Sequence, residues 1–121
     1  MKRKLMLVCV VMLSGVFLVG GMALAANFRG TDGPDEISGT KRADAIRGLG
    51  GNDRLSGSGG PDEIYGNGGS DRIFGNNGDD RLIVDDGRQD IIKCGDGYDR
   101  VYADGKDVVY YRCEWVKRPW E

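Results

Sequence analysis

The sequence contains no histidine, and this absence removes common kinds of functional site. Zinc sites are built largely from histidine and cysteine, and histidine is the most frequent general base in enzymes. Cysteine is also scarce, with three residues, of which Cys9 lies in an N-terminal apolar run that we expect to be removed. A catalytic centre of an ordinary kind therefore has few side chains from which to be built.

The chain also lacks, beyond residue 25, any segment suited to an α-helix. It has 21 glycines, and each glycine inside a helix costs about 1 kcal/mol. Collagen is excluded because the glycines recur every nine residues rather than every three. A disordered glycine-rich chain would not place aliphatic residues at fixed positions.

What the sequence does contain is a nine-residue repeat. Four units follow one another in register from Gly48 to Ile83: GLGGNDRLS, GSGGPDEIY, GNGGSDRIF and GNNGDDRLI. Each has glycine at positions one and four, aspartate at position six and an aliphatic residue at position eight. The period extends upstream to Gly30 and, after one inserted residue, downstream to Val109. Such a period indicates a solenoid.

Each unit fits a six-residue turn followed by a three-residue strand. In the strand the eighth residue points inward and its two neighbours point outward, because side chains alternate along a strand. The residues expected in the core are Ile37, Ile46, Leu55, Ile64, Ile73 and Leu82. The seventh position agrees with this prediction, since charged residues such as Arg54 and Glu63 occupy it.

Residues 1–25 have the form of a cleavable export signal. Lys2, Arg3 and Lys4 precede an apolar run, and Ala23-Leu24-Ala25 fits the small-residue rule for cleavage. An uncleaved membrane anchor is the alternative, since the run is nearly long enough to span a bilayer. Removing the three cations leaves 14 basic and 19 acidic residues, a net charge of −5. This charge disfavours nucleic acids and anionic membranes as partners and favours cations.

Two cysteines remain after processing, Cys94 and Cys113. In an exported protein a single pair most simply forms a disulfide, and two free thiols are the alternative. Residues 110–121 do not repeat and are rich in aromatic residues. We expect them to cap the open end of the core, with a sugar-stacking platform as the alternative. The aromatic residues concerned are Tyr98, Tyr102, Tyr110, Tyr111, Trp115 and Trp120.

The units Gly48–Ser56 and Gly66–Phe74 resemble the hemolysin-type (RTX) calcium-binding nonapeptide, G-G-x-G-x-D-x-U-x with U aliphatic. The resemblance covers about residues 30–109, and the ending from Cys94 to Val116 is similar to that of small secreted bacterial members. It implies an all-β, right-handed parallel β-roll with two nonapeptides per coil. We therefore expect a β-roll at residues 26–109 and a disulfide-linked cap at 110–121.

The resemblance also implies that calcium lies between turns stacked on the same edge, held by Asp carboxylates and turn carbonyls. With two units per coil, stacked residues are eighteen apart. One edge then carries Asp35, Asp53, Asp71 and Asp90, and the other carries Asp44, Asp62, Asp80 and Asp99. The expected best sites are Asp35/Asp53, Asp53/Asp71 and Asp62/Asp80.

The turn Gly39–Asp44 departs from the repeat. Lys41 and Arg42 bring positive charge close to the expected calcium site. Arg42 also has a Cβ where the fourth-position glycine is expected to have positive φ. Sites using Asp44 are expected to be weaker for this reason, and sites using Asp90 or Asp99 are expected to be weaker because of the downstream insertion.

Calcium suits these residues because it takes six to eight oxygen ligands and mixes carboxylates with carbonyls. Stacked carboxylates about 4.8 Å apart repel by about 3–4 kcal/mol at an effective dielectric of 20. We therefore expect calcium to drive folding. A metal-free solenoid whose Asp residues only stabilise turns is the alternative.

The carboxylates belong to the repeat and no separate catalytic domain fits in the chain, so we expect no enzymatic activity. The predicted function is a secreted calcium-binding structural or surface module. The alternative is a calcium-dependent binding protein that recognises a glycan or a protein through its strand faces or aromatic tail. Ice binding is disfavoured, since only Thr31 and Thr40 occupy corresponding positions.

Overall fold

The computed structural model describes residues 25–110 and 112–118. The predicted export signal, apart from Ala25, lies outside the described residues, as do Tyr111 and Trp120. Among the residues that are described, no helix has the length and apolar character needed to cross a membrane.

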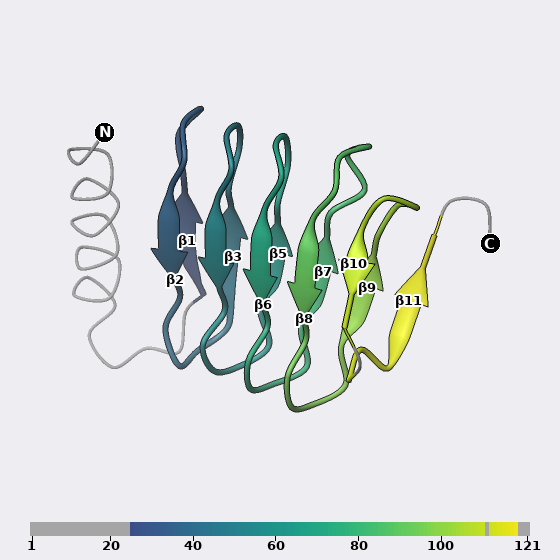
Figure 1. Ribbon diagram of the computed structural model, residues 1–121. Helices are drawn as coiled ribbons and strands as arrows, with labels where there is room; N and C mark the ends of the chain where they lie inside the picture. Colours follow the sequence, from purple (N-terminus) through teal and green to yellow (C-terminus); the bar gives the residue numbers. More distant parts are fainter. Residues whose placement is uncertain (1–24, 111, 119–121) are drawn as a thin grey trace.

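Eleven short strands form two sheets that face each other (Figure 1). The six-stranded sheet has the order β1-β3-β5-β7-β9-β11. Its strands are β1 (Ala26–Arg29), β3 (Asp44–Arg47), β5 (Glu63–Tyr65), β7 (Arg81–Ile83), β9 (Arg100–Tyr102) and β11 (Trp115–Lys117).

The five-stranded sheet has the order β10-β8-β6-β4-β2. Its strands are β2 (Glu36–Ser38), β4 (Arg54–Ser56), β6 (Arg72–Phe74), β8 (Ile91–Lys93) and β10 (Val108–Val109). All pairs in both sheets are parallel, and successive strands alternate between the sheets. The chain is therefore a β-solenoid in which two units make one coil, as the family resemblance implies.

The core lies between the sheets and consists mainly of the eighth-position residues of both sheets, joined in the downstream coils by Val84, Cys94 and Ala103. Ile64, for example, is fully buried, and so are the other predicted core residues, Ile37, Ile46, Leu55, Ile73 and Leu82. Ile92 and Val101 continue the core through the downstream coils. The expected alternation is also present, since the outward Arg54, Arg72 and Arg81 are exposed.

The inserted residue is absorbed in the turn between β7 and β8. Strand partners are eighteen residues apart upstream, as for Arg54 and Arg72, and nineteen apart across this turn, as for Arg72 and Ile91. The pairing of core residues stays in phase, because Ile73 still lies opposite Ile92. The insertion therefore lengthens a turn without displacing the core.

Both ends of the solenoid continue further than the repeat pattern indicates. β1 pairs with β3 and places Phe28, which is 2% exposed, at the head of the core. At the other end β11 pairs with β9, so the tail adds a further strand to the six-stranded sheet. The tail is held by a disulfide between Cys94 and Cys113, which confirms the predicted bridge.

Candidate metal centre

The sixth-position aspartates form two ladders, one along each row of turns. On the first edge Asp53 Oδ1 accepts the backbone N–H of Asp35 at 2.8 Å, and Asp71 Oδ1 accepts that of Asp53 at 2.8 Å. The ladder continues through Asp90 to Asp107. The second edge repeats the arrangement through Asp44, Asp62, Asp80, Asp99 and Glu114.

All eight aspartates named from the sequence therefore lie on the predicted edges, in the predicted order. Each has an exposed fraction of 4% or less. Two further acids that were not among the predicted site residues, Asp107 and Glu114, extend the ladders. The signal was present, because Asp107-Val108-Val109 and Glu114-Trp115-Val116 keep the spacing of acid and aliphatic residue found in the repeat.

Six of these carboxylates have one oxygen that is buried and has no hydrogen-bond partner. The unpaired atoms are the Oδ2 atoms of Asp53, Asp62, Asp71, Asp80, Asp90 and Asp99. A buried polar group without a partner carries a large desolvation cost, and for a charged group the cost is larger still. Each of these oxygens is therefore suited to a cation that binds from within the turns.

Burial and mutual repulsion raise the pKa values of these carboxyl groups. Loss of hydration is the main cause, and it raises the pKa of Asp53 to about 8 and that of Asp71 to about 7. On the second edge the same cause raises the pKa of Asp62 and of Asp80 to about 8. Neighbouring carboxylates on the ladder add to the increase, for example Asp80 beside Asp62. The ladders are thus poorly suited to hold negative charge without a counter-ion.

The glycine at position one leaves room for the carboxylate of its own unit. A Cβ added to Gly66 would lie 2.8 Å from Asp71 Oδ2, and one added to Gly75 would lie 2.7 Å from Asp80 Oδ2. Added at Gly48, it would also lie 2.9 Å from the carbonyl oxygen of Gly66 in the next coil. The space inside the turn is therefore bounded by carboxylate and carbonyl oxygens, which are the ligands that calcium prefers.

The four central turns share one backbone conformation. Their second-position residues Leu49, Ser58, Asn67 and Asn76 have φ between 61° and 71°. Their fourth-position glycines Gly51, Gly60, Gly69 and Gly78 also have positive φ. A positive φ is unusual for leucine and serine, and such strain is often found where a site needs a particular turn shape.

The first two turns are built differently, around threonine. Thr31 has no positive φ, and its backbone N–H donates to Asp35 Oδ2 at 2.6 Å, while its hydroxyl lies 3.0 Å from Asp35 Oδ1. Thr40 makes the same two contacts with Asp44. Threonine is β-branched and disfavours positive φ, and its hydroxyl also accepts the N–H two residues further on.

The threonine turns change what was expected of Arg42 and of the carboxylates of Asp35 and Asp44. Arg42 does not have the positive φ that the repeat predicted, because Thr40 replaces the central type of turn with its own. Both oxygens of Asp35 and Asp44 contact a threonine, so neither has an unpaired oxygen. The ligand roles of all eight aspartates stay predictions. Asp90 and Asp99 have a buried, unpaired Oδ2 like the central aspartates, whereas Asp35 does not.

Side chains alone do not complete a metal site in this part of the chain. Within residues 25–110 and 112–118, no three His, Cys, Asp or Glu side chains lie close enough together to bind one ion. A calcium ion here would need backbone carbonyls in addition to two carboxylates, and the stacked turns bring such carbonyls close. The donor set therefore fits calcium.

Comparison with known proteins gives one match. A family model described as the RTX calcium-binding nonapeptide repeat (4 copies) matches residues 29–64, 47–82 and 56–91. These matches together span residues 29–91, which are 63 of the 121 residues. No curated protein and no solved structure matches the chain.

Proposed function

The chain belongs to the RTX calcium-binding nonapeptide repeat family, and we propose that calcium bound along its two carboxylate ladders folds it into a secreted structural or surface module. RTX nonapeptide repeats bind calcium, so the chain is a calcium-binding repeat protein. The family is a binding repeat and not a family of enzymes. Which residues bind the ions, and what the folded chain then does, are the proposed part.

The observation that carries the proposal is the set of six buried, unpaired carboxylate oxygens. They occur at Asp53, Asp71 and Asp90 on the first edge and at Asp62, Asp80 and Asp99 on the second. We assign the calcium ligands to these six residues. Asp35 and Asp44 close the ladders at their N-terminal ends, where threonine donors take the place of the ion.

The ladder geometry explains why binding and folding would be coupled. Each Oδ1 holds the N–H of the preceding coil, so it is the Oδ2 of the same carboxylate that remains for the ion. When bound, calcium supplies the positive charge that offsets repulsion between stacked carboxylates. In the unfolded chain the same carboxylates are hydrated and far apart, so the binding free energy contributes to folding.

The assignment is tested by counting the calcium bound to the mature chain, residues 26–121, by equilibrium dialysis. A variant in which Asp53, Asp62, Asp71 and Asp80 are all replaced by Asn should bind far fewer ions than the natural chain. The matched control replaces Asp32 and Asp79 by Asn. These two residues lie in the turns but not on the ladders, so this control should bind as many calcium ions as the natural chain. Equal binding by the natural chain and the four-site variant would refute the assignment.

Export is proposed from the sequence of residues 1–25 and from the composition of the rest. The basic residues, apolar run and Ala-Leu-Ala ending have the form of a signal peptide. The Cys94–Cys113 disulfide is the kind of bond that persists in oxidising compartments. Expression of the full chain followed by N-terminal sequencing of the extracellular protein tests this, with Ala26 or Asn27 as the expected first residue. Retention of an intact N-terminus in the membrane fraction would favour the anchor instead.

A second candidate function is calcium-dependent binding through the outer strand faces. These faces carry arginines that lie over aromatic rings, with Arg47 5.2 Å from the ring centre of Tyr65 and Arg54 4.7 Å from that of Phe74. Aromatic rings with fixed cations suit acidic sugars or acidic protein surfaces. A glycan array run with and without calcium separates the two candidates, since a purely structural module would bind none of the glycans.

A further inference from the structure

The two ladders end differently at the C-terminal side of the solenoid. On the first edge Asp107 has both oxygens bonded, Oδ1 to the N–H of Asp90 at 2.9 Å and Oδ2 to the N–H of Asp104 at 2.7 Å. On the second edge the last carboxylate is Glu114, whose Oε2 accepts the N–H of Asp99 at 2.9 Å. Its Oε1 has no hydrogen-bond partner among the described residues. The last carboxylate of the first edge therefore has both oxygens bonded, whereas the last carboxylate of the second edge has one oxygen without a bond to the described residues.

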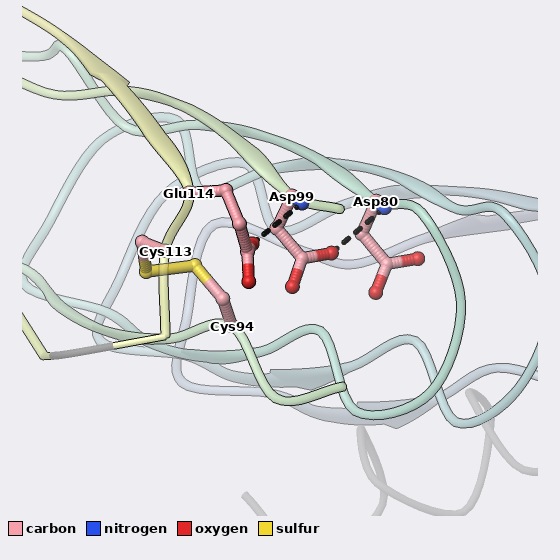
Figure 2. The surroundings of a disulfide bond; sticks show 5 residues. All are labelled: Asp80, Cys94, Asp99, Cys113 and Glu114. Atoms are coloured by element: carbon pink, nitrogen blue, oxygen red, sulfur yellow. Dashed lines mark hydrogen bonds between the residues drawn. A yellow bond between two sulfur atoms is a disulfide. The ribbon is translucent and has the colours of Figure 1, made fainter. Parts of the chain in front are cut away.

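The residue beside Glu114 on this ladder presents an unpaired oxygen of its own. Asp99 is fully buried, and its Oδ2 makes no hydrogen bond. Figure 2 shows that the second oxygens of Asp80, Asp99 and Glu114 point to the same side, away from the hydrogen bonds of the ladder. The end of the second edge thus has the same ladder hydrogen bond as the central aspartates, but its last carboxylate, that of Glu114, is exposed where theirs are buried.

The fold holds Glu114 in this place from both sides. The preceding residue, Cys113, is bonded to Cys94, with the two Cα atoms 5.3 Å apart. The following residue, Trp115, donates its N–H to the carbonyl of Asp99 at 3.2 Å and pairs with Arg100. Glu114 follows Asp99 by fifteen residues instead of eighteen, and its longer side chain still reaches the ladder. The disulfide therefore positions a carboxylate as well as fastening the tail.

We propose that Asp99 and Glu114 form a further calcium site at the C-terminal end of the second edge, beyond the residues that the family model covers. The inference rests on the proposed function, because it assigns the same ion to the same kind of ladder. Calcium at this place joins a carboxylate of the last full turn to one of the tail. The disulfide and the ion together then fasten β11 to β9.

The test is a calcium count on Glu114→Gln. Glutamine keeps an oxygen that can accept the N–H of Asp99, so the ladder bond is retained while the charge is removed. The variant should bind one ion fewer than the natural chain. Glu36→Gln is the matched control, since Glu36 is exposed on β2 and takes part in no hydrogen bond of either ladder, and it should bind the natural number. An unchanged ion count and affinity in Glu114→Gln would overturn the proposal, whereas a natural chain that binds no calcium would refute the proposed function itself.

A second measurement locates the site by energy transfer to terbium, which takes the place of calcium at oxygen ligands. Trp115 is the one tryptophan among the described residues and adjoins Glu114. Terbium emission excited through tryptophan should fall in Glu114→Gln to the level seen in Trp115→Phe, and Glu36→Gln should keep the natural emission. Undiminished emission from Glu114→Gln would place the bound ion elsewhere and contradict the proposal.

Replacing Cys94 and Cys113 by serine should lower calcium affinity more at the Asp99/Glu114 site than at the other sites. An equal loss of affinity at all sites would count against the positioning role of the disulfide.

Discussion

Asp71 holds the backbone N–H of Asp53 with one carboxylate oxygen, at 2.8 Å, and keeps its other oxygen buried and unpaired. One side chain therefore does two things at once. It joins two coils through a hydrogen bond, and it leaves a desolvated oxygen that only a cation or a proton can satisfy.

The first prediction compares two aspartates on opposite edges. Asp53→Asn should remove much of the calcium response, because Asp53 Oδ2 is unpaired in the structure. Asp44→Asn should change it little, because both oxygens of Asp44 contact Thr40. Calcium titrations of the two variants followed by circular dichroism make the comparison. An equal loss of calcium response in the two variants would mean that the contacts with Thr40 do not take the place of an ion at Asp44.

The second prediction concerns pH in the presence of a chelator. Burial raises the pKa of Asp99 to about 6 and those of Asp53 and Asp80 to about 8, whereas an unfolded aspartate titrates near 3.8. The folded state then binds more protons than the unfolded state between these values, so its stability is greatest at low pH, falls as the pH rises above about 3.8, and levels off above about 8. Circular dichroism in chelator at several pH values, with urea unfolding at the low pH values where the chain is folded, measures this. Calcium-free stability that increases with pH would contradict it.

With calcium the dependence on pH should reverse. The ion requires ionised carboxylates, so protons compete with it, and calcium affinity should increase as the pH rises through the same range. Calorimetric titrations at matched ionic strength give the comparison. The proton and the cation are thus expected to stabilise the same ladder under opposite conditions.

The third prediction tests the space inside the turns. Gly66→Ala should destabilise the folded state by about 1–3 kcal/mol, because the new methyl group would overlap Asp71 Oδ2 and approach Ile73 Cδ1 at 3.2 Å. Gly68→Ala is the control in the same turn. A Cβ at Gly68 meets nothing within 4 Å, so the change should stay within about 0.5 kcal/mol. Urea unfolding in calcium measures both variants, and a similar cost for the two would show that the turn is not tightly filled.

The fourth prediction concerns the disulfide. Cys94 and Cys113 are nineteen residues apart, and a cross-link of that span stabilises a chain by about 3 kcal/mol in the chain-entropy account. The Cys94→Ser, Cys113→Ser double variant should lose about that much stability at saturating calcium. A thiol count on the unfolded, unreduced protein provides the control, and it should find no reactive thiol in the natural mature chain.

The central coils could be predicted from the sequence because two positions fix them. An aliphatic residue at position eight, such as Ile64, and an aspartate at position six, such as Asp62, recur without exception from Asp35 to Leu82. Alternation along a strand then decides which side chains are buried. The core follows from this regularity, whereas the pairing of strands and the membership of each edge follow from the two units per coil that the family resemblance implies.

The ends of the molecule could not be predicted in the same way, because other residue types or spacings replace those of the repeat there. Phe28 stands in the core position with Ala26 in place of the aspartate, so β1 shows no repeat in the sequence. Glu114 stands where an aspartate would, at a shortened spacing. The threonine turns were missed for a different reason. Whether Thr31 bonds to Asp35 depends on the backbone conformation of the turn, which the spacing of glycines does not determine.

The most direct test of the account is circular dichroism of the mature chain, residues 26–121, during a calcium titration from chelator to millimolar calcium at neutral pH. The unpaired oxygens of Asp53, Asp62, Asp71, Asp80, Asp90 and Asp99 predict a largely unfolded spectrum in chelator and a rise in β-structure on adding calcium. Magnesium at the same concentration should not produce the change, since it demands a tighter octahedral site. A β-rich spectrum already present in chelator at this pH, and unchanged by calcium, would contradict the account.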